Sequence, residues 1–401
     1  MKFLFVHEVN WFEKVTYEIH DIPELLSIAG HEVTFIDFPE FLTTDPRNRR
    51  FSFKTSKAFA RSRAHLGSKV DVFTPGGVVA GNLRRNFATL TFVPLFWRTV
   101  RKQNIEVVVL YGVPTNGWQT VLLAKILKVP VIFRAIDIAH LLRETRFRIL
   151  VKIAESYIYK NVSHISAHNE ALKNYCVALG ASATKVSVDF PRLDLDRFKP
   201  CTRDENLALS LGIRPGQKIV FFRGTLYRFS GLEKFIDLFA AYLRQNADSC
   251  ILIVGSGEAE PAIRETISRL NLRQQVILTP FVSYDELVRY ICLADISVNT
   301  FIPSLVTHCV LPGRVLQSMA CGIPVVSTPL QGMMSYSQGT ETVTYRELDE
   351  SFVNAVCDLL SDTAKRQNLG VAGRDLVISK GTWQDFVRDF SDLAHNLVTN
   401  Q

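Results

Sequence analysis

The sequence has no hydrophobic run long enough to cross a lipid bilayer as a helix. Near its amino terminus only four apolar residues stand in a row, which is too few for the apolar region of a signal peptide. These absences predict a cytoplasmic protein, and peripheral attachment to the inner face of a membrane stays open as an option.

Cysteine is scarce, and its spacing is irregular. The seven cysteines lie far apart in the chain and form no Cys-x-x-Cys pair. An odd number of scattered cysteines is typical of reduced thiols in the cytosol. We therefore expect neither a disulfide nor a zinc site.

Acidic residues are missing from one stretch of the first half. The net charge is +7, and up to Asp196 there are 26 Lys and Arg against 18 Asp and Glu. The segment from Arg47 to Lys69 holds eight cations, three phenylalanines and no acid. Such a segment fits an anionic membrane surface or an anionic substrate, although a solvated loop has the same composition. No module that reads nucleic acid is recognisable, so we expect no nucleic acid partner.

At 401 residues the chain exceeds one ordinary hydrophobic core, which predicts two domains. Short β-branched apolar stretches alternate with segments of helical periodicity in both halves, as in an α/β fold with doubly wound parallel sheets. The expected strands are 2–6, 30–37, 70–73, 105–110, 130–134, 164–167, 218–222, 250–254, 276–278, 295–299 and 323–328. The main expected helices are 12–29, 92–103, 118–127, 144–159, 169–179, 232–246, 285–293 and 383–398.

Regular structure is interrupted near residues 191–200. We therefore place a first domain at 1–196, a linker at 197–216 and a second domain at 217–382. Residues 383–401 are expected to form a C-terminal helix, for which packing back on the first domain is one option. Ligands of parallel α/β sheets bind at the carboxyl ends of the strands, so we expect the two domains to face each other across a ligand-binding cleft.

Residues 311–329 form the motif with the clearest chemistry. They predict a turn, a short helix beginning near Pro312 and a buried strand. The free N–H groups at such a helix start attract anions. Arg314 lies in the first turn and Gln317 three residues later, so a guanidinium for phosphate and an amide for sugar hydroxyls would share one face. An ordinary strand–helix corner with a solvated arginine is the alternative.

The second half carries short motifs in a familiar order. They include Gly-Thr-Leu at 224–226, Ile-Leu-Ile-Val-Gly-Ser-Gly-Glu at 251–258, Ala-Asp-Ile-Ser-Val-Asn-Thr at 294–300 and Ser-Met-Ala-Cys-Gly-Ile-Pro-Val-Val-Ser-Thr at 318–328. Their order and spacing resemble the retaining GT-B glycosyltransferases of family 4, also called group 1. The resemblance covers nearly the whole chain, and it implies two facing Rossmann-like domains with a cleft between them.

The resemblance implies a nucleotide-sugar donor in the second domain and no metal cofactor. Guanidinium and N–H groups would stabilise the departing diphosphate. Glycines would let the backbone approach the ligand, although plain turns need them too. The implied donor-binding residues are Arg223, Gly224, Thr225, Arg228, Ser230, Gly255, Gly257, Val282, Leu311, Pro312, Gly313, Arg314 and Gln317.

Two pairs of positions depart from the family pattern. The family often has two glutamates eight positions apart, which here are Cys309 and Gln317. Gln317 can still hydrogen-bond a ribose, whereas Cys309 cannot replace a carboxylate. The family's Arg and Lys after strand 218–222 fall on Thr225 and Ser230. The neighbouring arginines, 223 and 228, are then the candidates for the phosphate charge.

In the first domain, relatives place a histidine near the end of the strand at 130–134, next to the transferred sugar. That place holds an isoleucine here, followed by Asp137, and His140 comes three residues later. We take Asp137 and His140 as catalytic candidates, although a lone histidine is often structural. Arg134 and Asn10 are candidates for acceptor binding.

We therefore expect a glycosyltransferase that moves a sugar from a UDP- or GDP-sugar to a carbohydrate or lipid-linked acceptor, in polysaccharide, lipopolysaccharide or glycolipid assembly. One alternative is a catalytically impaired GT-B-like binding or scaffold protein, because a family carboxylate is lost at Cys309. A second alternative is a sugar-nucleotide epimerase on the same architecture.

Overall fold

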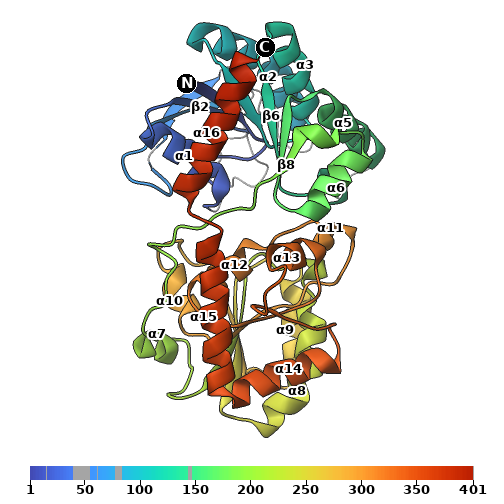
Figure 1. The fold of residues 1–401 in the computed structure, drawn as a ribbon. Coiled ribbons are helices and arrows are strands. Elements are labelled where there is room, and N and C mark those ends of the chain that lie inside the picture. The colour runs from blue at the N-terminus through green and yellow to red at the C-terminus, as the bar shows by residue number, and fades with distance from the viewer. Residues whose placement is uncertain (15, 39–54, 61, 77–83, 143–146, 401) are drawn as a thin grey trace. The chain divides into compact units, whose positions relative to one another are not determined.

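The computed structural model describes residues 1–14, 16–38, 55–60, 62–76, 84–142 and 147–400. These residues form two compact units. One consists of Met1–Pro191 together with Trp383–Gln401, and the other of Arg192–Thr382 (Figure 1). Each unit contains one sheet of mainly parallel strands, so the α/β prediction with two domains is confirmed.

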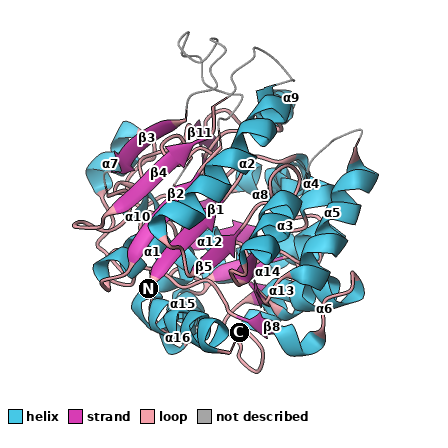
Figure 2. Cartoon of the chain, turned by 90° about the horizontal axis from the view of Figure 1, so that it is seen from above, coloured by secondary structure: helices cyan, strands magenta, loops and turns pink. Residues whose placement is uncertain are grey.

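The first unit is built on an eight-stranded sheet. Every neighbouring pair of strands is parallel except β3 and β4, which are antiparallel. Figure 2 shows β3, β4, β2 and β1 as neighbours in this sheet. The full order is β3 (Ser56–Ala60), β4 (Val70–Thr74), β2 (Glu32–Ile36), β1 (Lys2–Val6), β5 (Val107–Leu110), β6 (Val131–Ala135), β7 (His164–Ala167) and β8 (Val186–Val188).

Both faces of this sheet are covered because its central strands are apolar on both sides. Side chains alternate along β1, so Phe3 and Phe5 point to one face, and Leu4 and Val6 point to the other; all four are buried. The helices of this unit are α1 (Glu18–Ile28), α2 (Arg84–Gln103), α3 (Gly117–Leu127), α4 (Ala139–Leu142), α5 (Arg148–Asn161), α6 (Glu170–Ala178) and α16 (Trp383–Thr399), with a 3-10 turn at Ala183–Lys185.

The C-terminal helix α16 completes the core of the first unit. It lies beside α1, as the red and blue helices of Figure 1 show. Trp383, Phe386 and Phe390 belong to the same buried cluster as Phe3 and Phe5 of β1. The end of the chain is therefore part of the hydrophobic core built by its beginning.

The second unit is built on a six-stranded sheet in which all neighbouring strands are parallel. The order is β11 (Val276–Thr279), β10 (Ser249–Val254), β9 (Lys218–Arg223), β12 (Ile296–Asn299), β13 (Val325–Ser327) and β14 (Thr344–Tyr345). Its helices are α7 (Glu205–Ser210), α8 (Leu232–Gln245), α9 (Glu260–Arg269), α10 (Leu287–Ile291), α11 (Leu305–His308), α12 (Gly313–Ala320), α13 (Gln331–Tyr336), α14 (Glu350–Ser361) and α15 (Thr363–Ser379), with a 3-10 turn at Arg228–Ser230.

The segment 197–216, predicted as a linker, instead folds as part of the second unit. Phe198 is fully buried and packs edge-on against Tyr284 at a ring distance of 5.5 Å. Asp204 caps α7 and also pairs with Arg289 of α10 at 2.6 Å. The linker prediction failed because turn residues and prolines indicate irregular backbone but do not show whether that backbone is packed against a domain.

The prediction that the chain has no disulfide is wrong. Cys201 and Cys292 are joined in a disulfide, with a Cα–Cα distance of 5.9 Å. The pair links the segment after Pro200 to the end of α10. A separation of 91 residues hides such a pair from any reading of local spacing. The described residues contain no cluster of three or more groups that could hold a metal ion.

The basic segment from Arg47 to Lys69 is described only in part, because residues 47–54 and 61 lie outside the described residues. Its described part includes β3, which the sequence did not predict. Lys57 of β3 pairs with Asp71 of β4 at 2.8 Å. The guanidinium of Arg63 donates hydrogen bonds to two backbone carbonyls. Much of the described charge is thus used inside the fold.

Among the described residues, none of the helices has both the length and the apolar character that crossing a bilayer requires.

We expect Phe386→Ala to destabilise the first unit by about 3–5 kcal/mol, because it leaves a cavity between α16, Trp383 and Phe390. Ile378→Ala, at an exposed site on α15, should change stability by less than about 1 kcal/mol. Scanning calorimetry of the full chain measures both. Equal unfolding temperatures for the two variants would contradict the packing of α16 into this core.

Candidate functional site

Three of the predicted donor-binding residues meet at the carboxyl end of β9. Arg223 is the last residue of β9, and Arg314 and Gln317 lie on α12. Nη1 of Arg314 donates to the carbonyl oxygen of Arg223 at 2.9 Å, and Nη2 of Arg223 donates to Oε1 of Gln317. The Arg314 guanidinium also lies 4.9 Å from the ring centre of Phe222 and 4.3 Å from that of Phe301. These contacts fix both arginines in position.

Two cations without a carboxylate are held together here. Neither Arg223 nor Arg314 forms a salt bridge with a residue in the part of the chain that the structure describes. Burial lowers the pKa of Arg314 to about 9, and the charge of Arg223 adds to the effect. Burial also lowers the pKa of Arg223 to about 10, and its Nε lacks a hydrogen-bond partner among the described residues. Both remain cations at neutral pH, and the arrangement suits an anion.

The start of α12 adds a second feature that suits an anion. The helix begins at Gly313, and Pro312 precedes it in an extended conformation. No side chain caps this helix start, so its first N–H groups and the positive end of its dipole stay available. Leu311 is buried, and its side chain anchors the turn rather than facing solvent.

Three of the predicted donor-site glycines, at 224, 255 and 257, lie where the loops after β9 and β10 come into close contact. Gly255 has φ +148°, and a Cβ there would lie 2.0 Å from the carbonyl oxygen of Gly224. A Cβ on Gly257 would lie 2.5 Å from the carbonyl oxygen of Leu226. Gly224 has φ +129°, and its Cβ would lie 2.7 Å from Nη1 of Arg314. These glycines let the loops after β9 and β10 pack closely and leave room for the arginine.

Four other predicted donor residues form no hydrogen bond with Arg223 or Arg314 in the part of the chain that the structure describes. Arg228 is exposed, and Thr225 and Val282 are half-buried in loops at the same edge of the sheet. Ser230 is fully buried, its hydroxyl has no partner among the described residues, and its carbonyl accepts from Thr300 at 2.6 Å. The structure therefore puts the Ser230 side chain inside the unit, which does not fit the role of direct donor binding predicted for it.

Cys309, at the position of a family glutamate, directly follows α11. It is buried, and burial raises the pKa of its thiol to about 11. The side chain is therefore uncharged at neutral pH. His308 beside it accepts a hydrogen bond from the backbone N–H of Gln331, which gives it a structural role.

Arg134, predicted to bind an acceptor, lies in a closed network inside the first unit. Its side chain is fully buried and donates to both carboxylate oxygens of Glu18, at 3.0 and 3.1 Å, and to Ser166 at 2.8 Å. Its guanidinium also lies 4.9 Å from the ring centre of Phe386. We correct its role to a structural one, because the guanidinium is fully buried and already binds Glu18, Ser166 and the carbonyl oxygen of Asp189.

Glu18 is the anion of this network, and it is not among the site residues predicted from the sequence. Burial alone would raise its pKa, but Arg134 and His168 outweigh burial, so the pKa of Glu18 lies well below its usual range. His168 contacts Oε2 of Glu18 at 2.7 Å. A signal was present, since Glu18 shares the apolar face of α1 with Ile22 and Leu25.

His140 is oriented by a second buried carboxylate. Its Nδ1 lies 2.6 Å from Oε2 of Glu155, which is fully buried on α5, and its backbone N–H donates to Oε1 of Glu155 at 3.2 Å. The Tyr175 hydroxyl donates to the same carboxylate at 3.0 Å. Asp137 is half-buried just after β6, close along the chain to His140. Glu155 could have been found as an acid at a core position of its helix.

Asn10 has a structural contact in the loop after β1. Its Oδ1 accepts from the backbone N–H groups of Phe12 at 2.9 Å and Glu13 at 3.1 Å. This closes a turn over residues 10–13. Acceptor binding by Asn10 stays a prediction.

Comparison with known families matches both units. The family described as "Glycosyl transferases group 1" matches residues 217–362, and the "Glycosyl transferase 4-like domain" matches residues 19–188.

Among curated relatives, a D-inositol 3-phosphate glycosyltransferase of Thermobifida fusca is 29% identical over 206 residues, covering 48% of this chain and 46% of the relative. A GDP-mannose-dependent monoacylated alpha-(1-6)-phosphatidylinositol monomannoside mannosyltransferase of Corynebacterium glutamicum is 25% identical over 218 residues, covering 48% of this chain and 51% of the relative. The chain thus spans about half the length of the curated relatives it matches.

Solved structures match over nearly the whole chain. Sucrose-phosphate synthase of Thermosynechococcus elongatus superposes with a TM-score of 0.76 at 17% identity and covers 100% of both chains. HepE of Anabaena, in complex with UDP and glucose, superposes with a TM-score of 0.74 at 16% identity and covers 98% of this chain and 99% of its own. At these identities the likeness establishes the GT-B fold.

We expect Glu18→Gln to destabilise the protein by about 3–5 kcal/mol at neutral pH, because it leaves Arg134 buried without a carboxylate. The folded pKa of Glu18 is depressed, so its contribution is present above the unfolded value of about 4.3 and is lost as pH falls below it. The difference in stability between variant and wild type should therefore be constant above about pH 5 and shrink as pH falls from about 5 to about 2.

Thermal unfolding at several pH values checks this prediction, with Glu265→Gln at an exposed site as the matched control. A constant difference across that pH range would show that the charge of Glu18 does not stabilise the fold.

Proposed function

Because the chain belongs to the group 1 glycosyltransferases, we propose that it is a retaining enzyme that moves a sugar from a UDP- or GDP-sugar to a carbohydrate or lipid-linked acceptor. The setting we propose is polysaccharide, lipopolysaccharide or glycolipid biosynthesis. Curated relatives carry names that include GDP-mannose dependence, and HepE was solved with UDP, so both nucleotides stay in the proposal.

The observation that carries the proposal is the pair Arg223 and Arg314, held beside the start of α12 with no carboxylate partner among the described residues. Two desolvated cations repel each other, and a diphosphate would relieve this repulsion. The free N–H groups of α12 would bind the same phosphate oxygens.

Glycosyl transfer needs this charge at one moment in particular. As the bond between sugar and diphosphate breaks, negative charge grows on the leaving oxygen, and the sugar becomes oxocarbenium-like. Cations fixed beforehand stabilise that charge without having to reorganise. We propose that Arg223, Arg314 and the α12 dipole supply this stabilisation, that no metal cofactor is needed, and that Gln317 binds the ribose.

In the first unit we propose that His140 acts beside the transferred sugar. Its Nδ1 is tied to Glu155, which leaves Nε2 as the ring atom for an interaction with a hydroxyl group. We propose Asp137 as a second polar group at this strand end.

Attachment to the inner face of a membrane is part of the proposal. The sequence suggested the segment from Arg47 to Lys69 for this role, but Lys57 and Arg63 of that segment already have partners in the fold. The segment therefore offers fewer free cations among its described residues than the sequence implied.

A GT-B-like binding protein is the second candidate, and the observation that favours it is the uncharged Cys309. Such a protein would bind the donor without turning it over.

We expect Arg314→Ala to weaken nucleoside diphosphate binding about 100-fold, since a charge-assisted bidentate contact contributes about 1.5–3 kcal/mol. Arg314→Lys should lose about tenfold, because charge remains but the planar fork is gone. Calorimetric titration measures both, with Arg273→Ala at an exposed site as the control. Without nucleotide, Arg314→Ala should unfold no earlier than wild type, since a repulsion is removed. Unchanged nucleotide affinity would overturn the proposed donor site.

We expect wild-type protein to hydrolyse its sugar donor slowly without acceptor, and His140→Ala to lower that rate about 100-fold with donor affinity unchanged. His395→Ala, on the exposed side of α16, is the matched control. Donor binding with no turnover by the wild type would favour the binding-protein alternative, and full turnover by His140→Ala would remove His140 from the mechanism.

A further inference from the structure

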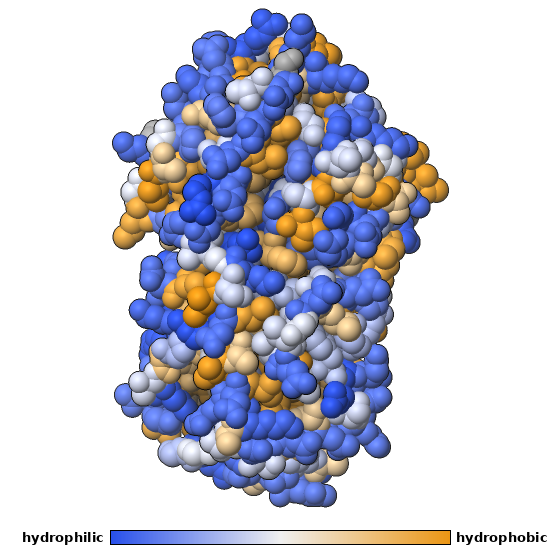
Figure 3. All heavy atoms as spheres, viewed as in Figure 1, coloured by the Kyte–Doolittle hydropathy of each residue, from blue (hydrophilic) through white to orange (hydrophobic). Residues whose placement is uncertain are grey.

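Large apolar side chains are exposed on three neighbouring helices of the first unit. Helix α3 lies between and contacts both α2 and α5, and Figures 1 and 2 show the three side by side. In Figure 3 orange, apolar surface gathers at the right-hand edge of this unit, where Figure 1 places α5. Ile149, Leu150 and Ile153 of α5 are all more than half exposed.

Helix α3 is apolar on its outer side as well as on its inner side. Its inner side buries Val121 and Ala124 in the core. Its outer side presents Trp118, Leu122 and Ile126, which are 41%, 41% and 58% exposed and recur every four residues. A row of large apolar side chains exposed on a helix often marks an interaction site, so this stripe is a candidate contact surface.

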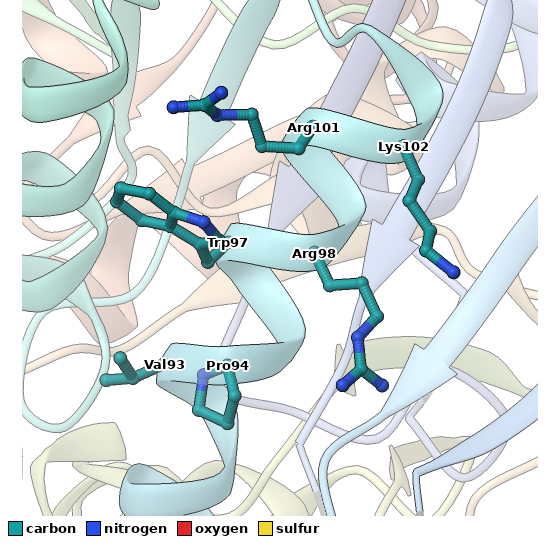
Figure 4. Close-up of a pocket in the computed structure, with 6 residues that line it drawn as sticks. All are labelled: Val93, Pro94, Trp97, Arg98, Arg101 and Lys102. Atoms are coloured by element: carbon teal, nitrogen blue, oxygen red, sulfur yellow. The ribbon is translucent and has the colours of Figure 1, made fainter.

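Helix α2 continues the same surface with an aromatic and basic pattern. Its outer side forms an open cavity of about 520 Å³ that Figure 4 shows in close-up. Trp97 and Arg101 point to one side of the helix, with the guanidinium 5.4 Å from the ring centre, while Arg98 and Lys102 point to the other. All the residues that line this cavity come from α2, so it is an open surface depression rather than an enclosed pocket.

The charge of this surface has one sign. Helices α2 and α3 contain no Asp or Glu, and the single acid of α5, Glu155, is fully buried against His140. Exposed cations lie on the same three helices as the exposed apolar side chains, among them Arg98, Lys102, Lys125 and Lys152.

We propose that α2, α3 and α5 dock the first unit onto an anionic lipid bilayer. Trp and aliphatic side chains would enter the headgroup region, and the long Lys and Arg side chains would reach lipid phosphates beside them. Each of these groups faces outward from a helix that is itself held in the fold, so the docking surface is preformed.

The charge pattern distinguishes this partner from the other ones. In a two-fold dimer the same patch meets itself, and here cations would be brought against cations. Lysine is depleted in protein–protein interfaces, whereas α2, α3 and α5 carry exposed lysines at positions 102, 125 and 152. An anionic bilayer satisfies the apolar stripe and the cations together.

This inference names a surface other than the segment from Arg47 to Lys69, and it does not depend on the proposed transfer reaction. Its test therefore needs no sugar acceptor. If the acceptor is lipid-linked, docking through these helices would bring the first unit to it.

The test is flotation of the full chain with vesicles of phosphatidylcholine alone and with about one third phosphatidylglycerol added. Wild type should bind the anionic vesicles at least about tenfold more tightly than the neutral ones. An apolar-stripe variant, Leu122→Glu/Ile126→Glu, and a charge variant, Arg98→Glu/Lys102→Glu, should each lose at least about tenfold in binding to anionic vesicles.

Matched controls carry the same changes at exposed sites elsewhere: Leu209→Glu/Ile378→Glu for the stripe and Lys185→Glu/Arg273→Glu for the charge. They should bind within about twofold of wild type. Nucleotide affinity and unfolding temperature, measured on every variant, separate a loss of docking from a loss of fold or of the donor site.

Three results would overturn the inference. The first is no binding by wild type, or equal binding to neutral and anionic vesicles. The second is loss of binding in Arg49→Glu/Arg50→Glu but not in the α2 and α3 variants, which would return the role to the basic segment. The third is a wild-type dimer in sedimentation equilibrium that Leu122→Glu/Ile126→Glu dissociates with no change in flotation.

Discussion

The forced proximity of two arginines is the constraint on which the second unit depends. Arg223 and Arg314 repel each other, and partial burial weakens the screening of that repulsion by water. They are kept in place by the carbonyl of Arg223 and by the rings of Phe222 and Phe301. Gly224 lacks a side chain where a Cβ would meet Arg314. The strand end, the helix start and the loop glycines therefore all hold one arrangement of two cations, and we propose that an anion binds there.

In the first unit, by contrast, a buried arginine is paired with a carboxylate. Arg134 also lies near the carboxyl end of a parallel strand, yet both carboxylate oxygens of Glu18 accept hydrogen bonds from its guanidinium. The pKa of Arg134 is raised above its ordinary value, although burial alone would lower it. The charge of Arg134 is thus neutralised by Glu18, whereas Arg223 and Arg314 have no carboxylate partner among the described residues. The two cases differ in whether a carboxylate partner is present, and for Arg134 that partner comes from a distant part of the chain.

Neutral side chains at two positions shape the proposed site. Where the family often has glutamates, this chain has Cys309, whose burial keeps the thiol protonated, and Gln317, whose amide oxygen accepts from Arg223. Neither position therefore carries a carboxylate that could compete with the proposed phosphate for the arginines. Exposed acids are also absent from α2, α3 and α5, whose exposed charges are all cations.

The sequence determined the alternation of strands and helices, the two sheets and the position of the α12 motif, because periodicity and turn residues are local properties. It also singled out Arg223, Arg314 and Gln317, which the structure brings into contact, while their role in donor binding stays a prediction. It did not reveal β3, the Cys201–Cys292 disulfide, the packing of 197–216 or the buried partners Glu18 and Glu155. These depend on contacts between residues far apart in the chain. Tertiary structure alone decided which charges are neutralised, because a side chain's partner is set by packing and leaves no trace in local spacing.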